Sequence, residues 1–223
     1  MKKPIFADGQ IYHVFNRGVE KRDIFIDDKD YLRFIHSLYE FNDVKPVKNF
    51  HYFFNHKTGN VEARKLFGYE EKEPIVEILV FTLMPNHYHL MLRQIKDDGT
   101  VKFMQKLGTG YTMYFNKRYS RAGSLFQGRF KAVHLTREEH FIHLPHYIHS
   151  NPYRGSTSIY DLVKYRWSSY PDYIGKKNFP SITQRDFLLD IFGGEEQFKI
   201  YTQDRLSHGD DLMAQNIEGF TLE

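Results

Sequence analysis

The stretch FTLMPNHYHLMLRQ, residues 81–94, places two histidines inside an otherwise apolar run. The Pro-Asn pair at 85–86 is a turn signal, so the residues on its two sides predict two consecutive strands. Because side chains alternate between the faces of a strand, His87 and His89 share one face, and the apolar residues beside them occupy the other. The apolar face suits a protein core, and the histidine face suits either a ligand or solvent.

Two interpretations of the histidine pair remain open on this pattern alone. Two imidazoles about 7 Å apart on one strand face can share a divalent cation if a third ligand comes from elsewhere. A half-exposed strand with two surface histidines gives the same pattern, and the chain contains 12 histidines. A second group of residues is therefore needed to decide between them.

The remaining segments predict the order strand, helix, strand, strand, helix, strand, helix. Adjacent strands joined by a hairpin, with helices beside them, predict an α+β fold: a ferredoxin-like antiparallel sheet with helices packed on one face. The segments lie at 10–17, 29–43, 75–84, 87–94, 101–120, 122–135 (a loop leading into a strand) and 138–150.

This order predicts the domain organisation as well. Residues 1–175 are expected to form the domain, interrupted by an insertion at 46–73 whose turn signal at 57–60 suggests a hairpin. Residues 176–223 are expected to form a C-terminal helical extension and tail.

The composition bounds the class of protein. A chain of 223 residues with 41% hydrophobic residues can bury a real core. The absence of cysteine excludes disulfides and thiolate metal sites. No run approaches the roughly 18 apolar residues of a membrane span. We therefore expect a soluble, cytoplasmic protein with no membrane partner.

Charge is distributed unevenly along the chain. Residues 99–137 contain eight Lys or Arg and no Asp or Glu, and aromatic residues are interleaved with them. Such a segment suits a polyanion, although a basic helix face with core aromatics would give the same pattern. The predicted DNA-binding residues are Lys102, Lys106, Lys117, Arg118, Arg121, Arg129 and Lys131.

A second group of residues lies in LPHYIHSNPY, residues 144–153. Tyr147 and Asn151 are four residues apart near the end of a predicted helix, which places them on one helix face. A carboxamide oxygen can bind a hard metal ion, and the phenol would then lie beside that ion. The alternative is that Asn151 caps the helix before Pro152 and that Tyr147 is a core residue.

Five separated motifs together resemble those of the REP-associated tyrosine transposases, single-tyrosine members of the HUH superfamily. The motifs are MPNHYHLML, MQKLGTGYTMYFNKRY, GSLFQGRFKA, YIHSNPYRG and WSSYPDY, and they agree in order and spacing. The resemblance covers roughly residues 10–173. Three features depart from the family pattern: Pro145, Tyr153 and the insertion at 46–73.

The resemblance implies a fold, a reaction and a set of site residues. It implies a ferredoxin-like core that nicks single-stranded DNA beside hairpins and rejoins strands through a 5′-phosphotyrosine intermediate. Carried over residue by residue, Tyr147 is the nucleophile, and His87, His89 and Asn151 hold a divalent metal, Mg or Mn. Two imidazole ligands favour Mn²⁺. Single-stranded or hairpin DNA is the implied partner, and a homodimer that exchanges the tyrosine is left open.

Other functions fit parts of the sequence. A non-catalytic DNA-hairpin-binding protein descended from a transposase would keep the basic segment and would be free to lose one of the four site residues. A metal-dependent protein that binds or cleaves RNA is a further alternative. Tyr111 and Tyr114, in the basic segment, are rival tyrosines that we assign to packing or to base contacts.

Overall fold

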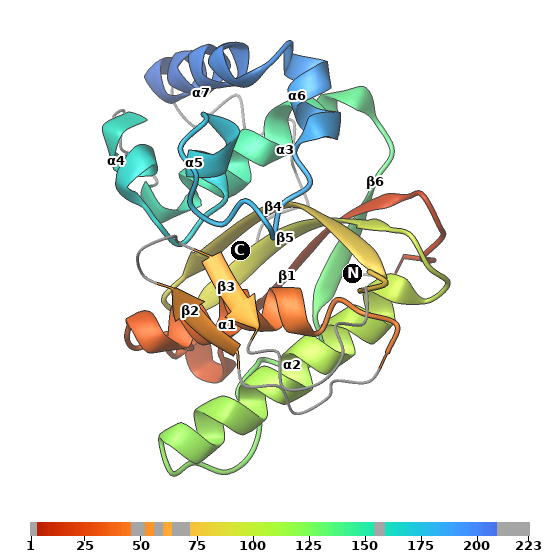
Figure 1. Cartoon of the computed structure of the whole chain (residues 1–223), viewed down its shortest axis with the longest axis vertical. Coiled ribbons are helices and arrows are strands. Elements are labelled where there is room, and N and C mark those ends of the chain that lie inside the picture. The colour runs from red at the N-terminus through yellow and green to blue at the C-terminus, as the bar shows by residue number, and fades with distance from the viewer. Residues whose placement is uncertain (1–3, 46–51, 56–59, 64–71, 154–158, 209–223) are drawn as a thin grey trace.

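The computed structural model describes residues 4–45, 52–55, 60–63, 72–153 and 159–208. Its centre is a four-stranded antiparallel sheet in the order β4-β5-β1-β6 (Figure 1). The strands are β1 (Ile11–Arg17), β4 (Val76–Met84), β5 (His87–Gln94) and β6 (Lys131–Leu135). The predicted α+β class and the ferredoxin-like antiparallel sheet are confirmed.

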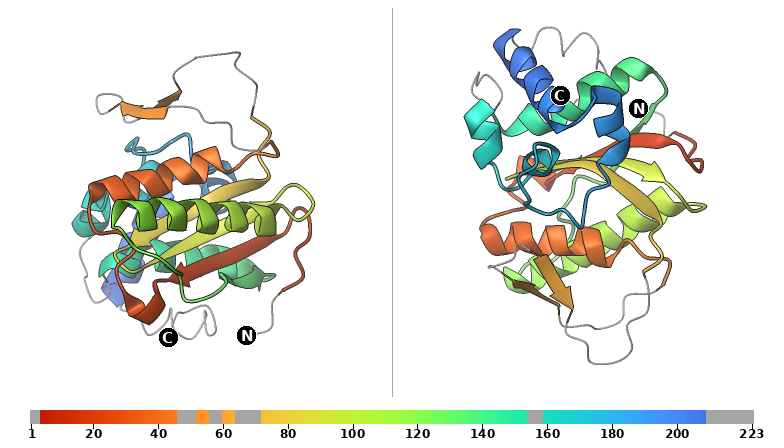
Figure 2. Two further views of the ribbon diagram at one scale, coloured as in Figure 1. Left: turned by 90° about the horizontal axis from the view of Figure 1, so that it is seen from below. Right: turned by 45° about the horizontal axis from the view of Figure 1, so that its top comes forward.

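Helices α1 (Asp28–Glu40) and α2 (Gly99–Arg118) cover one face of this sheet (Figure 2). Tyr88, Leu90 and Leu92 of β5 point toward them and belong to the larger buried apolar cluster. Helix α1 begins at Asp27, whose side chain accepts hydrogen bonds from the backbone N–H groups of Lys29 and Asp30. The apolar face of β5, which lies opposite the face with His87 and His89, therefore belongs to the main core.

The opposite face is covered by helices as well, in contrast to the prediction of helices on one face only. A second apolar cluster joins Met91 of β5 to Leu144 and Ile148 of α3 and to Leu188 and Phe198 of the C-terminal region. The helices are α3 (Glu138–Ser150), α4 (Ile159–Lys164), α5 (Tyr170–Tyr173), α6 (Asp186–Phe192) and α7 (Glu195–His208), with the 3-10 helix η2 (Asn151–Tyr153) after α3.

This second layer is possible because the face of β5 that carries the histidines is not wholly polar. Met91 follows His89 on that face and gives α3 an apolar surface to pack on. Helix α6 and helix α7 pack against α3 within the same cluster. The division at residue 175 stays a prediction.

Two short elements complete the described structure. Strands β2 (Tyr52–Asn55) and β3 (Asn60–Ala63) pair with each other in an antiparallel ribbon, as the turn signal in the insertion predicts. The 3-10 helix η1 (Val19–Lys21) follows β1. Within the described residues, none of the helices combines the length and the apolar character needed to cross a bilayer.

Candidate active site

The histidine face of β5 meets helix α3, and this contact brings three of the predicted site residues together. The ring of Tyr147 lies edge-on to the ring of His89, with 5.9 Å between their centroids. The rings of His87 and His89 lie 5.3 Å apart, also edge to face. His89 and Tyr147 are almost completely buried, whereas His87 is partly exposed at the start of its strand. Tyr147 of α3 therefore contacts His89, and His89 contacts His87 on the same strand.

Helix α3 runs through Pro145 and continues to Ser150, so the proline does not displace Tyr147 from the site. The helix begins after Arg137, whose backbone N–H donates to Nδ1 of His140 at 3.4 Å. Backbone angles at Asn151 are still helical (φ −50°, ψ −39°), which keeps Asn151 one turn beyond Tyr147.

The side chain of Asn151 is consistent with a ligand role. Its amide nitrogen Nδ2 is buried and has no hydrogen-bond partner among the described residues. Since the O and N atoms of a carboxamide are nearly indistinguishable in shape, a half-turn about the last bond puts an acceptor oxygen in the same place. Within the described residues, no group of three His, Cys, Asp or Glu is placed to hold a metal ion.

His13, which the sequence interpretation missed, lies beside the pair. Its Nε2 atom is 2.8 Å from Nδ1 of His89, and both side chains are buried. Burial lowers the pKa of His13 to about 3, so this imidazole is neutral at physiological pH. The alternation of side chains along β1 places His13 and Phe15 on the same face of the strand. Only the pairing of Phe15 with His89 shows that this is the face that carries His89.

The other histidines of α3 are bonded elsewhere. Nδ1 of His146 lies 2.8 Å from Oγ1 of Thr202, and Nε2 of His149 lies 2.9 Å from Oγ of Ser169. Both imidazoles are fully buried, and burial lowers both pKa values. These histidines tie α3 to the C-terminal half of the chain.

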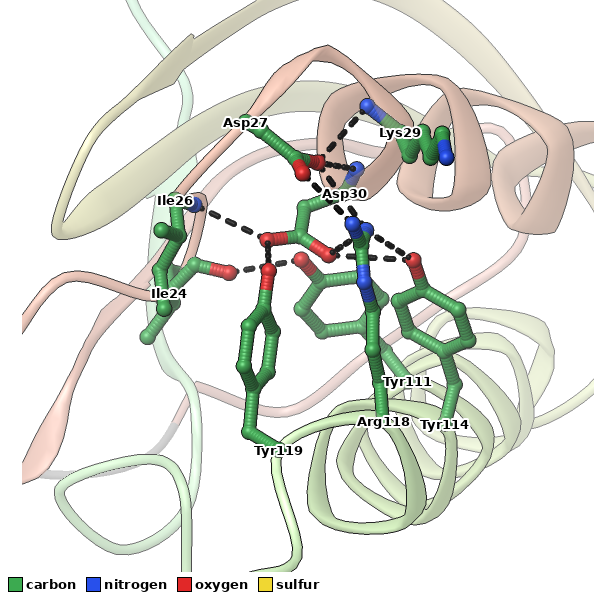
Figure 3. A network of polar contacts seen from close by, with 9 residues as sticks. All are labelled: Ile24, Ile26, Asp27, Lys29, Asp30, Tyr111, Tyr114, Arg118 and Tyr119. Atoms are coloured by element: carbon green, nitrogen blue, oxygen red, sulfur yellow. Dashed lines mark hydrogen bonds and ion pairs between the residues drawn. The ribbon is translucent and has the colours of Figure 1, made fainter.

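The predicted DNA-binding residues divide into three groups. Arg118 is partly buried and bonds to Asp27 and Asp30 at the start of α1 and to the hydroxyl of Tyr114 (Figure 3). This ion-pair network speaks against its predicted role. Side chains of the second group lie on the exposed surface: Lys102, Lys117, Arg129 and Lys131.

The two remaining basic residues are partly buried and have protein partners. Lys106 donates to the carbonyl oxygen of Asp43, and Arg121 donates to the side chain of Asn116. An open groove of about 620 Å³ lies between α2 and residues 124–130, and exposed Arg129 lines it.

The rival tyrosines have structural partners. The hydroxyl of Tyr111 donates to the carbonyl oxygen of Ile24, and its ring is fully buried in the main core. The hydroxyl of Tyr114 donates to Asp30 (Figure 3). Their assignment to packing agrees with these contacts.

Comparison with known proteins agrees with the motifs. Residues 44–151, which include β4, β5, α2, β6 and α3, match the family described as "Transposase IS200 like". One similar solved structure is titled "Structure of the REP associates tyrosine transposase bound to a REP hairpin". It has a TM-score of 0.53 and 13% sequence identity, over 83% of this chain and 92% of that chain.

Among curated proteins, none matches this chain. At 13% identity the structural likeness concerns the fold, whereas the family match concerns the sequence that holds the histidine pair, Tyr147 and Asn151. Residues 44–151 thus match the IS200-like transposase family, and the chain has the fold of a REP-associated tyrosine transposase.

Proposed function

We propose that this protein is a metal-dependent nickase and strand transferase for single-stranded DNA beside hairpins, acting through a 5′-phosphotyrosine intermediate. The observation that carries the proposal is the contact between the rings of Tyr147 and His89, because it unites residues 58 positions apart (147 − 89). A core tyrosine needs no histidine partner, whereas a nucleophile must lie beside the groups that bind the scissile phosphate.

His87, His89 and Asn151 would hold the metal ion. Two imidazoles and a carboxamide form a ligand set suited to Mn²⁺ and compatible with Mg²⁺ when phosphate oxygens complete the shell. The amide of Asn151 is buried and has no hydrogen-bond partner in the part of the chain that the structure describes, which fits this role because a half-turn would present its oxygen to a cation. When bound, the ion supplies positive charge that polarises the scissile phosphate.

The chain's own residues perform the transfer. The phenolic oxygen of Tyr147 loses its proton and attacks the phosphorus atom, and the bond from phosphorus to the 3′ oxygen breaks. The products are a 5′-phosphotyrosine link and a free 3′-OH. Since one phosphodiester is exchanged for another, an incoming 3′-OH can reverse the reaction without ATP. Burial of Tyr147 between its own helix α3 and strand β5 restricts the side chain, which favours attack from a fixed position.

DNA binding is proposed for the exposed cations of the basic segment. The similar solved structure is described as bound to a REP hairpin, which makes hairpin DNA the natural first ligand to test. Lys102, Lys117, Arg129 and Lys131 would contact phosphates, and aromatic side chains near the groove at α2 could stack on unpaired bases. A homodimer stays a prediction.

The test is a cleavage assay on labelled single-stranded hairpin oligonucleotides with varied flanking sequences, in the presence of Mn²⁺. Wild-type protein is expected to form a covalent adduct that survives denaturing electrophoresis. Tyr147→Phe should bind the same DNA and form none. Tyr153→Phe is the matched control, since Tyr153 lies in η2 and its ring contacts Tyr165.

The second candidate function is a DNA-hairpin-binding protein without catalysis. Wild-type protein that binds hairpins tightly but yields no adduct on any oligonucleotide of the set would favour it. An adduct that persists in Tyr147→Phe would instead move the nucleophile to another residue.

A further inference from the structure

The side chain of Asn86 holds the imidazole of His87 in one orientation. Oδ1 of Asn86 lies 2.6 Å from Nδ1 of His87, and Nδ2 of Asn86 donates to the carbonyl oxygen of Lys21 at 3.1 Å. The second bond assigns the amide, because a backbone carbonyl can only accept. Oδ1 is therefore an acceptor, so Nδ1 of His87 must be the protonated nitrogen that donates to it. In the neutral ring, the other nitrogen, Nε2, then carries the lone pair.

The loop that supplies the Lys21 carbonyl is bonded tightly to the turn between β4 and β5. The N–H of Gly18 donates to the carbonyl oxygen of Asn86 at 2.8 Å, and the N–H groups of Ile24 and Phe25 donate to that of Pro85. Lys21 has a left-handed backbone, with φ of 59°. A non-glycine residue rarely adopts this conformation, so the loop keeps it because the surrounding bonds compensate.

His13 bonds to Nδ1 of His89 just as Asn86 bonds to Nδ1 of His87. Nε2 of His13 lies 2.8 Å from Nδ1 of His89, and the two rings are nearly parallel, with 14° between their planes. Phe15 stacks on His89 at 27°, which fixes the ring plane further. In a hydrogen bond between two neutral imidazoles, one nitrogen donates and the other accepts. If His89 uses Nε2 as a ligand, its Nδ1 must donate to His13.

We propose that Asn86 and His13 are positioning residues that keep Nδ1 of His87 and His89 protonated and so leave both Nε2 atoms as ligand atoms. This inference rests on the proposed metal-dependent function. Both predicted ligands thus have their Nδ1 atom engaged by a neighbour from the protein, one from the turn and one from β1. Such outer partners fix the tautomer and ring orientation of ligating histidines, and their loss typically lowers metal affinity 10–100-fold.

The experiment measures Mn²⁺ binding by the electron paramagnetic resonance signal of the free ion, with the full chain and no DNA. Asn86→Ala and His13→Leu are expected to bind Mn²⁺ about 10–100-fold more weakly than wild type. Asn86→Asp and His13→Gln each restore an acceptor oxygen and should recover most of the affinity. His134→Leu is the matched control, because His134 bonds Gln10 and stacks on Tyr12, on the other face of the sheet.

A second readout does not depend on metal. In ¹⁵N NMR spectra of the metal-free wild type, His87 and His89 should both show the tautomer protonated at Nδ1. Asn86→Ala should release His87 to a mixture of tautomers, and Asn86→Asp should not. This spectrum also keeps the inference testable if His13→Leu fails to fold.

The outcomes separate the two claims. Wild-type protein that does not bind Mn²⁺ contradicts the metal dependence in the proposed function. Wild-type protein that binds Mn²⁺, with unchanged affinity in both Asn86→Ala and His13→Leu, contradicts the positioning inference alone. A wild-type His87 protonated at Nε2 also overturns the inference.

Discussion

Asp30 has a fully buried carboxylate in helix α1, and most of its partners come from the region of helix α2 (Figure 3). Oδ1 accepts from Tyr114 and Arg118, and Oδ2 accepts from Tyr119 and from the backbone N–H of Ile26. The basic segment of the sequence contains no acid, so its arginine could be expected to face solvent. The carboxylate that pairs with Arg118 belongs to Asp30, which lies 88 residues earlier in the chain. Only the fold shows this pairing.

Arg118 and Lys117 are adjacent in α2, and their substitution is therefore expected to affect different properties: stability for Arg118 and DNA binding for Lys117. Arg118→Met leaves the Asp30 carboxylate buried without its cation and should cost about 3 kcal/mol of unfolding free energy. Lys117→Met, at an exposed position, should change stability by no more than about 0.5 kcal/mol but should weaken DNA binding. Urea denaturation and fluorescence anisotropy with a hairpin oligonucleotide measure the two quantities. Equal stability of the two variants would show that the network is not structural.

At the scale of elements, the sequence pattern predicts strands and helices well where one face is apolar. Strand β5 follows from alternation and from the turn at 85–86, and the order of strands and helices gives the sheet. Alternation also places His87 and His89 on one face. It cannot give the partner of His89, because His13 reaches it only through the register between β1 and β5.

The second layer of helices was not predicted for a related reason. Helix α3 has histidines on several sides, so its sequence does not show a single apolar stripe. His146 and His149 are buried, and they form hydrogen bonds with Thr202 of α7 and with Ser169 next to α5. Those partners lie 56 and 20 residues away in the chain, beyond the reach of local pattern.

Two glycines of α2 provide a matched test of helix packing. A Cβ atom on Gly110 would lie 2.4 Å from the ring of buried Phe41, whereas a Cβ on Gly108 would meet no atom of the described residues within 4 Å. Gly108→Ala should therefore stabilise the protein by about 0.5–1 kcal/mol through helix propensity. Gly110→Ala should instead destabilise it by about 1–3 kcal/mol because α1 and α2 cannot approach as closely.

Thermal or urea unfolding of both glycine variants checks this prediction. Stabilisation by both substitutions would mean that Gly110 is not required for the contact with Phe41. Glycine has the same low helix propensity at both positions, so the sequence alone cannot distinguish them.

The contact between α3 and α7 predicts a pH dependence. Burial lowers the pKa of His146 well below its usual 6.5, so the unfolded state binds a proton more readily than the folded state. The stability that His146 contributes is therefore present above about pH 6.5 and is lost as the pH falls below it. Between pH 7 and pH 5 the loss from this one group should reach about 2 kcal/mol.

The measurement is urea denaturation of wild type and His146→Leu at both pH values. The variant should lose less stability on acidification than wild type, since leucine does not titrate. Equal losses in the two proteins would contradict a buried, neutral His146.

For the whole molecule, the charge distribution predicts how DNA binding responds to salt. The formal net charge is only +3, so affinity must depend on the local patch and not on the overall field. If four exposed cations contact phosphates, the logarithm of affinity should fall with the logarithm of salt with a slope of about 3. Anisotropy titrations over a salt series measure it, and each neutralised residue should reduce the slope by about 0.7. A slope near zero would exclude the basic segment as the DNA-binding surface.

The proposed reaction involves the whole molecule because it joins a strand, a helix and a DNA end in one covalent step. The most direct test is mass spectrometry of the peptides from the DNA-linked protein after nuclease digestion. The account predicts a nucleotide attached to the oxygen of Tyr147 by its 5′ phosphate. A nucleotide found on any other side chain, such as Tyr153, would contradict it.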